Sequence, residues 1–167
     1  MEFRRAVKSD IDRIMNIIKQ AQDYFKEQGI NQWQNNYPNP DTINKDIEKG
    51  YGYVLLKEGE IVGTVAVSFD GERTYDRIYD GKWIGNIDYA VIHRMAIDSN
   101  LRGQGLASVI IDNIERMCLA KDIHSIRIDT HEDNKSMQRL IEKNGFKYCG
   151  IIYLDDNSKR LAYEKLI

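Results

Sequence analysis

The chain has 167 residues, 42% of them hydrophobic and 30% charged, which is enough apolar material for one folded core. Its net charge of −2 gives no electrostatic reason to bind nucleic acid or an acidic membrane, and no apolar run reaches the roughly 20 residues of a membrane span. The charged start Met1–Arg5 lacks a signal-peptide core, so we expect one cytoplasmic domain over residues 1–167. Cys118 and Cys149 lie in apolar patterns and are predicted to be buried thiols, with no disulfide and no metal site.

The first elements form a strand, a helix and a loop. A short strand over residues 3–6 precedes a helix that we expect to start at a capping box of Ser9 and Asp12 and to end near Gly29. Four apolar side chains share one face of this helix and favour packing on a sheet: Ile11, Ile14, Met15 and Ile18. Residues 30–40 contain both prolines of the chain and show no periodicity, which predicts a shaped loop.

A second short helix, starting at Asp41 or Thr42 and stopping at Gly50, leads into a hairpin. Its strands are residues 51–57 and 61–69, so part of the sheet is antiparallel. Residues 70–90 are harder to interpret, because glycines interrupt tyrosine-rich pieces that fit either strand extensions or an irregular flap.

The pattern becomes regular from Val91. A strand over residues 91–97, a helix from Leu106 to about Ala120 and a strand over residues 125–130 form a βαβ unit, whose crossover requires parallel strands.

The end of the chain reads as a helix and a hairpin. After the helix from about Asn134 to Asn144, Gly145 is predicted to be left-handed, with Phe146 packing back on Ile141. Residues 146–154 and 160–166 then form a closing hairpin.

The most informative motif is the loop Arg102-Gly103-Gln104-Gly105-Leu106-Ala107, which joins the strand over 91–97 to the following helix. Amide N–H groups at a helix start have no partner inside the helix and carry partial positive charge, so a diphosphate can bind there. The two glycines allow close backbone approach, and Arg102 adds a cation. Ser108 replaces the third glycine of a dinucleotide fingerprint, and the loop is not a Walker-type NTP site.

This loop fits the pattern Gln/Arg-x-x-Gly-x-Gly/Ala, and together with His93-Arg94-Met95-Ala96-Ile97-Asp98 it resembles the GNAT superfamily of acetyl-CoA-dependent N-acetyltransferases. The resemblance extends to the segment Glu142-Lys143-Asn144-Gly145-Phe146 and covers nearly the whole chain. It implies an α/β fold with a central mixed, mostly antiparallel sheet, a splayed pair of parallel strands and about four flanking helices.

The resemblance implies that acetyl-CoA is the co-substrate, with its pyrophosphate on the glycine loop and its pantetheine arm beside the preceding strand. Asn134 fits this arm and equally fits a plain helix N-cap, two roles that can coexist. The residues implied for CoA are Met95, Ala96, Ile97, Arg102, Gly103, Gln104, Gly105, Leu106, Ala107, Ser108, Asn134, Ser136 and Met137.

Acetyl transfer to an amine needs a base, a stabilised oxyanion and protonation of the leaving thiolate. His93 lies in register with the family's histidine-bearing strand and is our candidate base, with a histidine-like ascending limb in the pH profile; a core histidine is the alternative. His131 either faces the amine or begins a helix turn. The family's frequent tyrosine acid is replaced by Ile141. Tyr148 is our candidate acid, with strand packing as its alternative. Transfer without a dedicated acid also stays open, because the CoA thiolate is a good leaving group and the helix N-terminus supplies positive potential.

The acceptor is expected to be a primary amine of a small molecule or peptide, met by the loop over residues 30–40. Trp33 and Tyr37 are large enough to form a specificity wall there, or to anchor the loop on the core. We expect no nucleic acid, membrane or metal partner. The sequence is compatible with a homodimer. A second hypothesis is an acyl-CoA-binding regulatory or partner-binding domain without turnover, for which Ile141 is the argument.

Overall fold

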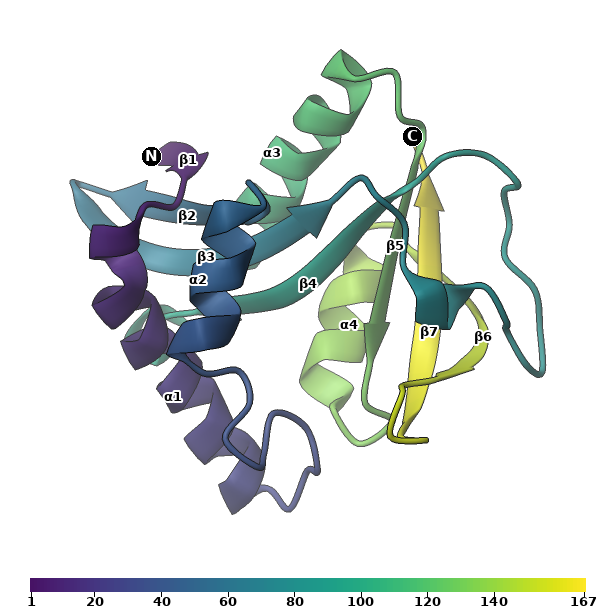
Figure 1. Ribbon diagram of the computed structural model, residues 1–167, viewed down its shortest axis with the longest axis horizontal. Coiled ribbons are helices and arrows are strands. Elements are labelled where there is room, and N and C mark those ends of the chain that lie inside the picture. The colour runs from purple at the N-terminus through teal and green to yellow at the C-terminus, as the bar shows by residue number, and fades with distance from the viewer. The chain divides into compact units, whose positions relative to one another are not determined.

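The computed structural model describes residues 1–167, in which seven strands form a mixed sheet with the hydrogen-bonded order β1-β2-β3-β4-β5-β7-β6 (Figure 1). The sheet is mostly antiparallel with one parallel pair, β4–β5, as predicted. The strands are β1 Glu2–Arg5, β2 Gly52–Lys57, β3 Glu60–Ser68, β4 Ala90–Ile97, β5 Ser125–Thr130, β6 Lys147–Tyr153 and β7 Lys159–Leu166. The helices are α1 Ile11–Glu27, α2 Pro40–Glu48, α3 Leu106–Ala120 and α4 Lys135–Lys143, with short 3-10 helices η1 Lys8–Asp10, η2 Arg73–Tyr75 and η3 Ser99–Leu101.

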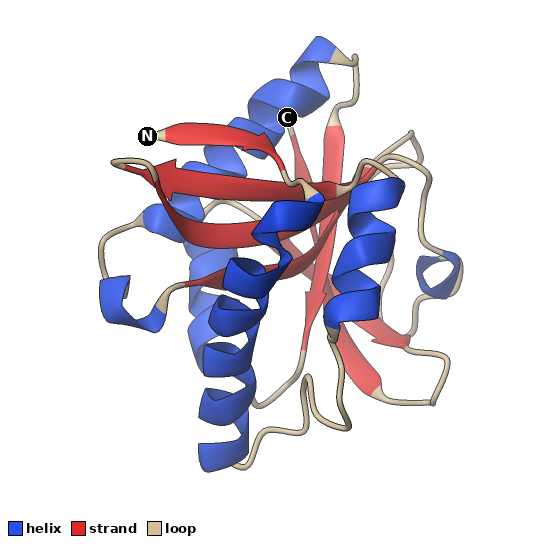
Figure 2. Ribbon diagram, turned by 60° about the vertical axis from the view of Figure 1, so that its left-hand side comes forward, coloured by secondary structure: helices blue, strands red, loops and turns tan.

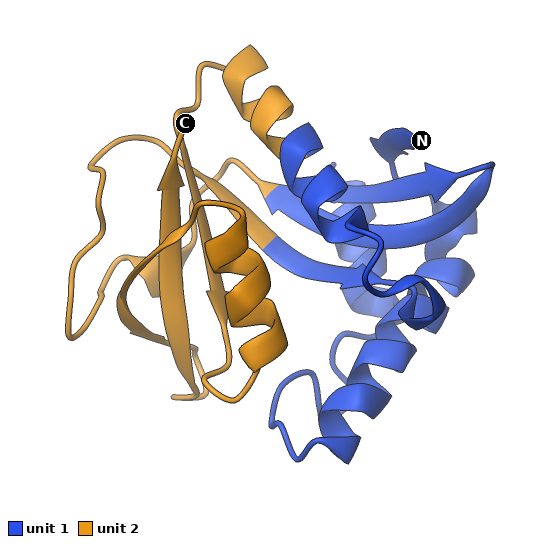
Figure 3. Ribbon diagram, turned by 180° about the vertical axis from the view of Figure 1, so that it is seen from behind, with its two compact units in different colours: residues 1–67, 93–113 blue, residues 68–92, 114–167 orange.

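The chain divides into two units (Figure 3). Unit 1 comprises residues 1–67 and 93–113, and unit 2 comprises residues 68–92 and 114–167. None of the helices combines the length and the apolar character that crossing a membrane requires.

In unit 1, helices α1 and α2 cover one face of the strands (Figure 2). The apolar stripe of α1 packs on this face, as its periodicity predicts, in a cluster of Ala6, Ile14, Ile17, Ile18, Ile43, Val54, Leu56, Ile61 and Ala96. On the other face, Gly63 of β3 lets α3 approach closely. A Cβ at Gly63 would lie 2.8 Å from Ile97 Cδ1 and 3.0 Å from Ile110 Cδ1, so a side chain there would require these two isoleucine ends to move.

Local signals explain the ends of these elements, with one exception. Helix α2 begins with Pro40 after a capping box in which Asn39 accepts the N–H of Thr42, and the β2–β3 turn has positive φ at Glu58 and Gly59. The predicted capping box of Ser9 and Asp12 is wrong. The buried Asp10 carboxylate instead accepts the N–H of Val7 at 2.8 Å and pairs with Arg4, so the turn η1 precedes α1.

In unit 2, β5, β7 and β6 pair antiparallel, and β4 contributes the parallel pairs Ala90 with Ile126 and Val91 with Arg127. Helix α4 ends as predicted, since Gly145 has a φ of +89° and the N–H of Phe146 donates to Ile141 O at 3.2 Å. Both cysteines are buried and free, as expected.

The segment over residues 70–90, which the sequence left unassigned, is an irregular flap held on β5, β7 and β6. It contains only η2 and a bridge in which Tyr79 and Ile151 exchange backbone hydrogen bonds of 2.8 Å. Glycines permit this contact, because a Cβ at Gly81 would lie 1.9 Å from Cys149 O and a Cβ at Gly150 would lie 2.6 Å from Tyr79 O.

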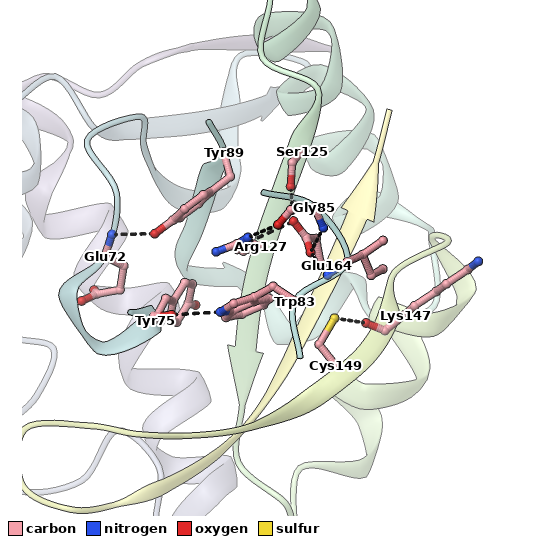
Figure 4. A network of polar contacts seen from close by, with 11 residues as sticks. Glu72, Tyr75, Trp83, Gly85, Tyr89, Ser125, Arg127, Lys147, Cys149 and Glu164 are labelled. Carbon is pink, nitrogen blue, oxygen red and sulfur yellow. Dashed lines mark hydrogen bonds and ion pairs between the residues drawn. The ribbon is translucent and has the colours of Figure 1, made fainter. Parts of the chain in front are cut away.

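A buried polar network fastens this flap (Figure 4). Glu164 of β7 is 0% exposed and accepts hydrogen bonds from Ser125 Oγ at 2.5 Å, Arg127 Nε at 3.0 Å and the N–H groups of Ile84 and Gly85 at 2.6 and 3.1 Å. The Arg127 guanidinium lies 4.1 Å from the ring centre of Trp83 and 4.0 Å from that of Tyr89. One carboxylate and one guanidinium therefore join two strands to an otherwise irregular segment.

Candidate functional site

The glycine loop has the predicted context within unit 1, because it follows β4 and η3 and leads directly into α3. Gly103 and Gly105 have φ values of +78° and +74°, which L side chains rarely adopt. Nothing lies within 4 Å of a Cβ built at either glycine, so the space above the loop is open to a ligand. The carbonyl of Gly105 accepts the N–H of Val109 at 3.2 Å, which places this glycine at the N-terminus of α3.

The start of the loop is held by Asp98, which is buried at the end of β4. Its carboxylate accepts Arg13 Nη2 at 2.6 Å and the N–H of Asn100 at 3.0 Å, while the N–H of Ser99 donates to Gln20 Oε1 at 2.8 Å. Burial works against the charged form, but the hydrogen bonds from Asn100 and Arg13 outweigh it and lower the pKa of Asp98. An ionised Asp98 thus ties the loop to α1.

Two cations flank the loop and are available to an anion. Arg102 is exposed, and its guanidinium lies 4.4 Å from the ring centre of Tyr24 on α1. Lys57, at the end of β2, donates to Gln104 Oε1 at 3.2 Å. Helix-start amides, two glycines without side chains and two nearby cations are the groups that bind a diphosphate.

Strand β4 is irregular next to His93. Arg94 has a φ of +50°, which a regular strand does not allow and a non-glycine residue adopts at a cost of about 1–3 kcal/mol. Three hydrogen bonds hold its guanidinium: Nε and Nη2 donate to Asp46 at 2.7 and 2.5 Å, and Nη1 donates to Tyr37 Oη at 3.0 Å. Beyond this irregularity, Met95 and Ala96 are buried and Ile97 is half-buried.

The electrostatics of this strand favour a neutral His93. Desolvation and, second, the neighbouring Arg94 lower the pKa of His93 from 6.5 to about 4, against an opposing effect of Asp46. The imidazole of His93 is therefore neutral at pH 7. Burial also works against the charge of Arg94, but the Asp46 carboxylate overcomes it and raises the pKa of the guanidinium.

The two aromatic residues of the loop over residues 30–40 have different surroundings. Trp33 packs against the core cluster, with its ring edge-on to Phe25 at 5.8 Å between centres. This packing agrees with the alternative that Trp33 anchors the loop on the core. Tyr37 is 43% exposed and directs its hydroxyl to Arg94. The loop is further tied to α1, since Gln22 Nε2 donates to Pro38 O at 3.0 Å.

The predicted site residues of unit 2 lie around α4 and on β6. Asn134 caps α4 by accepting the N–H of Met137 at 3.1 Å, so its N-cap role is confirmed; Ser136 is exposed in the same first turn. His131 begins the turn before the helix, where its Nδ1 accepts the N–H of Asp133 at 3.0 Å. His131 has a lowered pKa because of desolvation and, second, the positive charge of Arg160.

The candidate acid Tyr148 lies on β6 in unit 2. It is 51% exposed, and the centre of its ring lies 5.7 Å from that of Tyr163 in an edge-on contact. This contact agrees with the alternative that Tyr148 packs on the strand. Ile141, at the family's tyrosine position, is fully buried. Thr130, at the end of β5, is also fully buried, and its Oγ1 has no hydrogen-bond partner.

Sequence reasoning missed two arrangements: Asp46 with Arg94 and Tyr37 in unit 1, and the network around Arg127 and Glu164 in unit 2. The signal that could have found them is an arginine inside an apolar strand run, as in Ile92-His93-Arg94-Met95 and Ile126-Arg127-Ile128. Such an arginine needs a carboxylate partner when it is buried.

Comparisons with known proteins agree with this geometry. A family model described as "Acetyltransferase (GNAT) family" matches residues 17–146. The chain is 36% identical to an acetyltransferase of the GNAT family from Streptococcus agalactiae 2603, with a TM-score of 0.91 over 99% of this chain and 95% of that one. It is also 24% identical over 87% of its length to the uncharacterized N-acetyltransferase YesJ of Bacillus subtilis (strain 168), of which 81% is covered. A GNAT-family acetyltransferase structure from Listeria monocytogenes 4b F2365, at 20% identity, has a TM-score of 0.76 over 99% of this chain and 94% of that one and shares the fold.

Proposed function

The chain belongs to the acetyltransferase (GNAT) family, and on this premise we propose that it transfers the acetyl group of acetyl-CoA to a primary amine of a small molecule or peptide. The observation that carries the proposal is the glycine loop at the start of α3, where two left-handed glycines leave open space over the helix-start amides. The family supports an acyltransferase, and this loop supports CoA as the carrier of the acyl group.

The residues present fit CoA. We propose that the amides of residues 103–107 and Arg102 hold its pyrophosphate, with Gln104, Leu106 and Ser108 lining the same turn. The backbone of residues 95–97 is proposed to hold the pantetheine arm. For unit 2, taken by itself, Asn134, Ser136 and Met137 are proposed as CoA contacts. The unpartnered buried Oγ1 of Thr130 supports a polar ligand group at the end of β5. When bound, acetyl-CoA supplies the thioester from which the acetyl group is transferred.

In this proposal His93 acts as a hydrogen-bond acceptor at neutral pH. Because its pKa is about 4, the imidazole is neutral there and accepts a hydrogen bond from the amine or from a water next to it. An imidazole of such low basicity removes a proton weakly, so the acceptor itself has to arrive largely as the free amine. His131 is the second candidate for this role. Tyr148 is proposed to donate a proton to the leaving sulfur.

The acceptor is proposed to lie against the loop over residues 30–40, with exposed Tyr37 as the wall. Trp33 contributes chiefly by fixing this loop on the core. The phenol of Tyr37 and the guanidinium of Arg94 give the wall a polar surface.

The test mixes the protein with acetyl-CoA, a panel of amines and a thiol reagent. Amine-dependent release of thiol, together with mass-spectrometric detection of the N-acetyl product, is the expected result. Tyr148→Phe is run in parallel and is expected to lower turnover, because it removes the phenol that is proposed to protonate the leaving sulfur. Binding of acetyl-CoA by calorimetry with no thiol released by any amine would contradict turnover and favour a regulatory acyl-CoA-binding domain.

A further inference from the structure

One guanidinium joins three segments of unit 1. Arg94 belongs to β4, Asp46 to α2, and Tyr37 to the loop that precedes α2. Asp46 is only 6% exposed, and its carboxylate binds Nε and Nη2 in a bidentate pair of 2.7 and 2.5 Å. This geometry uses the planar fork of arginine, which a lysine ammonium cannot reproduce.

Arg94, Asp46 and Tyr37 together form a clamp, and it acts at a strained point of the backbone. The φ of +50° at Arg94 persists only where the surroundings impose it, and the three hydrogen bonds of its side chain are such a restraint. The residues on either side of it are His93 and Met95, which the proposed function places beside the amine and the pantetheine arm. Any relaxation of Arg94 would therefore turn both neighbours.

The clamp also fixes the loop over residues 30–40 relative to β4. Gln22 on α1 and the capping box of Asn39 hold the loop near its C-terminal end, whereas the hydroxyl of Tyr37 ties it to the strand. Tyr37 is 43% exposed, so removing its hydroxyl breaks the hydrogen bond to Arg94 without a loss of core packing.

We infer that Arg94 is a positioning residue for acetyl transfer: held by Asp46 and Tyr37, it sets the backbone of β4 between His93 and Met95 and fixes the acceptor loop against that strand. The inference rests on the proposed function. It predicts that loss of Asp46 lowers kcat and that loss of the Tyr37 hydroxyl raises the acceptor KM.

The experiment compares wild type with Asp46→Asn, Arg94→Lys and Tyr37→Phe in steady-state kinetics with varied acceptor. Asp46→Asn and Arg94→Lys are expected to lower kcat by roughly 10-fold to 100-fold, since small misplacements near the reacting atoms have effects of this size. Tyr37→Phe is expected to raise the acceptor KM severalfold with a smaller change in kcat. The dissociation constant of CoA is expected to change less than twofold in Tyr37→Phe, which leaves the Arg94–Asp46 pair in place.

Asp41→Asn, an exposed carboxylate on the same helix, is the matched control and should keep wild-type kinetics. Hydrogen exchange followed by mass spectrometry gives a readout besides activity. It should become faster in residues 33–37 and 93–95 of Asp46→Asn and Arg94→Lys, and in residues 33–37 of Tyr37→Phe. Tyr37→Phe keeps the test decisive if a change at the buried ion pair unfolds the protein.

Wild-type kcat and KM in folded Asp46→Asn and Tyr37→Phe, with unchanged exchange, would overturn the inference. A wild-type protein that binds acetyl-CoA but acetylates no amine would instead overturn the proposed function and the catalytic part of the inference. In that case the exchange data would still decide whether Arg94 fastens the loop to β4.

Discussion

His93 should leave a measurable signature in the pH dependence of stability. Desolvation and the charge of Arg94 lower its pKa from 6.5 to about 4 in the folded protein. At ~1.4 kcal/mol per pH unit, protonating this imidazole costs about 3 kcal/mol more in the folded than in the unfolded chain. The perturbation is His93→Gln, which removes the titrating group and keeps a polar side chain.

The linkage between protonation and folding sets the direction in which the stability changes with pH. Because the folded pKa lies below the unfolded one, the unfolded chain binds the extra proton between these two values, and the stability contributed by neutral His93 is complete above pH 6.5 and is lost as the pH falls toward 4. Between pH 7 and pH 4.5 the wild type should therefore lose about 2.5 kcal/mol more unfolding free energy than His93→Gln.

Urea unfolding of both proteins at several pH values between 4.5 and 7 measures this difference, and NMR of the imidazole gives the midpoint directly. His124→Gln is the control. His124 is exposed, and the hydrogen bond from its ring to Asp122 raises its pKa, so the stability it contributes is present at low pH and lost as the pH rises. Equal pH slopes for wild type and His93→Gln, or an NMR midpoint near 6.5, would refute the reasoning.

Three further outcomes are expected. Glu164→Gln leaves the buried Arg127 without its anionic partner and should lower the unfolding free energy by about 3–5 kcal/mol. Glu132→Gln, at an exposed ion pair, should leave the melting temperature nearly unchanged, and equal melting temperatures of the two variants in calorimetry would contradict this. Gly105→Val should weaken CoA binding strongly. The control Gly29→Val, at a φ of +69° with equally open space, should lower the stability of the fold and leave CoA binding unchanged. Unchanged CoA affinity of folded Gly105→Val in calorimetric titration would exclude the loop as the pyrophosphate site. CoA at 100 times its dissociation constant should add about 2.7 kcal/mol of stability, seen as a higher melting temperature, and an equal shift with ATP or NAD would argue against a CoA site.

The sequence by itself determined the elements and the glycine loop. Both depend on short-range physics: apolar periodicity places helix α3 and its strands, positive φ selects Gly103 and Gly105, and the carboxamide of Asn134 binds an amide three residues away. The Ser9 cap failed for a reason of the same kind. Asp10 competed for the turn and also had Arg4 as a long side-chain partner, which a pattern of spacings does not weigh.

Only the tertiary structure decided which charges meet and how much water reaches them. Arg94 pairs with Asp46 and Tyr37 across 48 and 57 residues of chain, and Glu164 on β7 accepts hydrogen bonds from strand β5 and from the flap over residues 70–90. The pKa of His93 depends on the same information, because desolvation is a property of the surrounding packing and not of neighbours in the sequence. Residue type and spacing identify the groups that can react, and the fold sets the charge and orientation with which they do so.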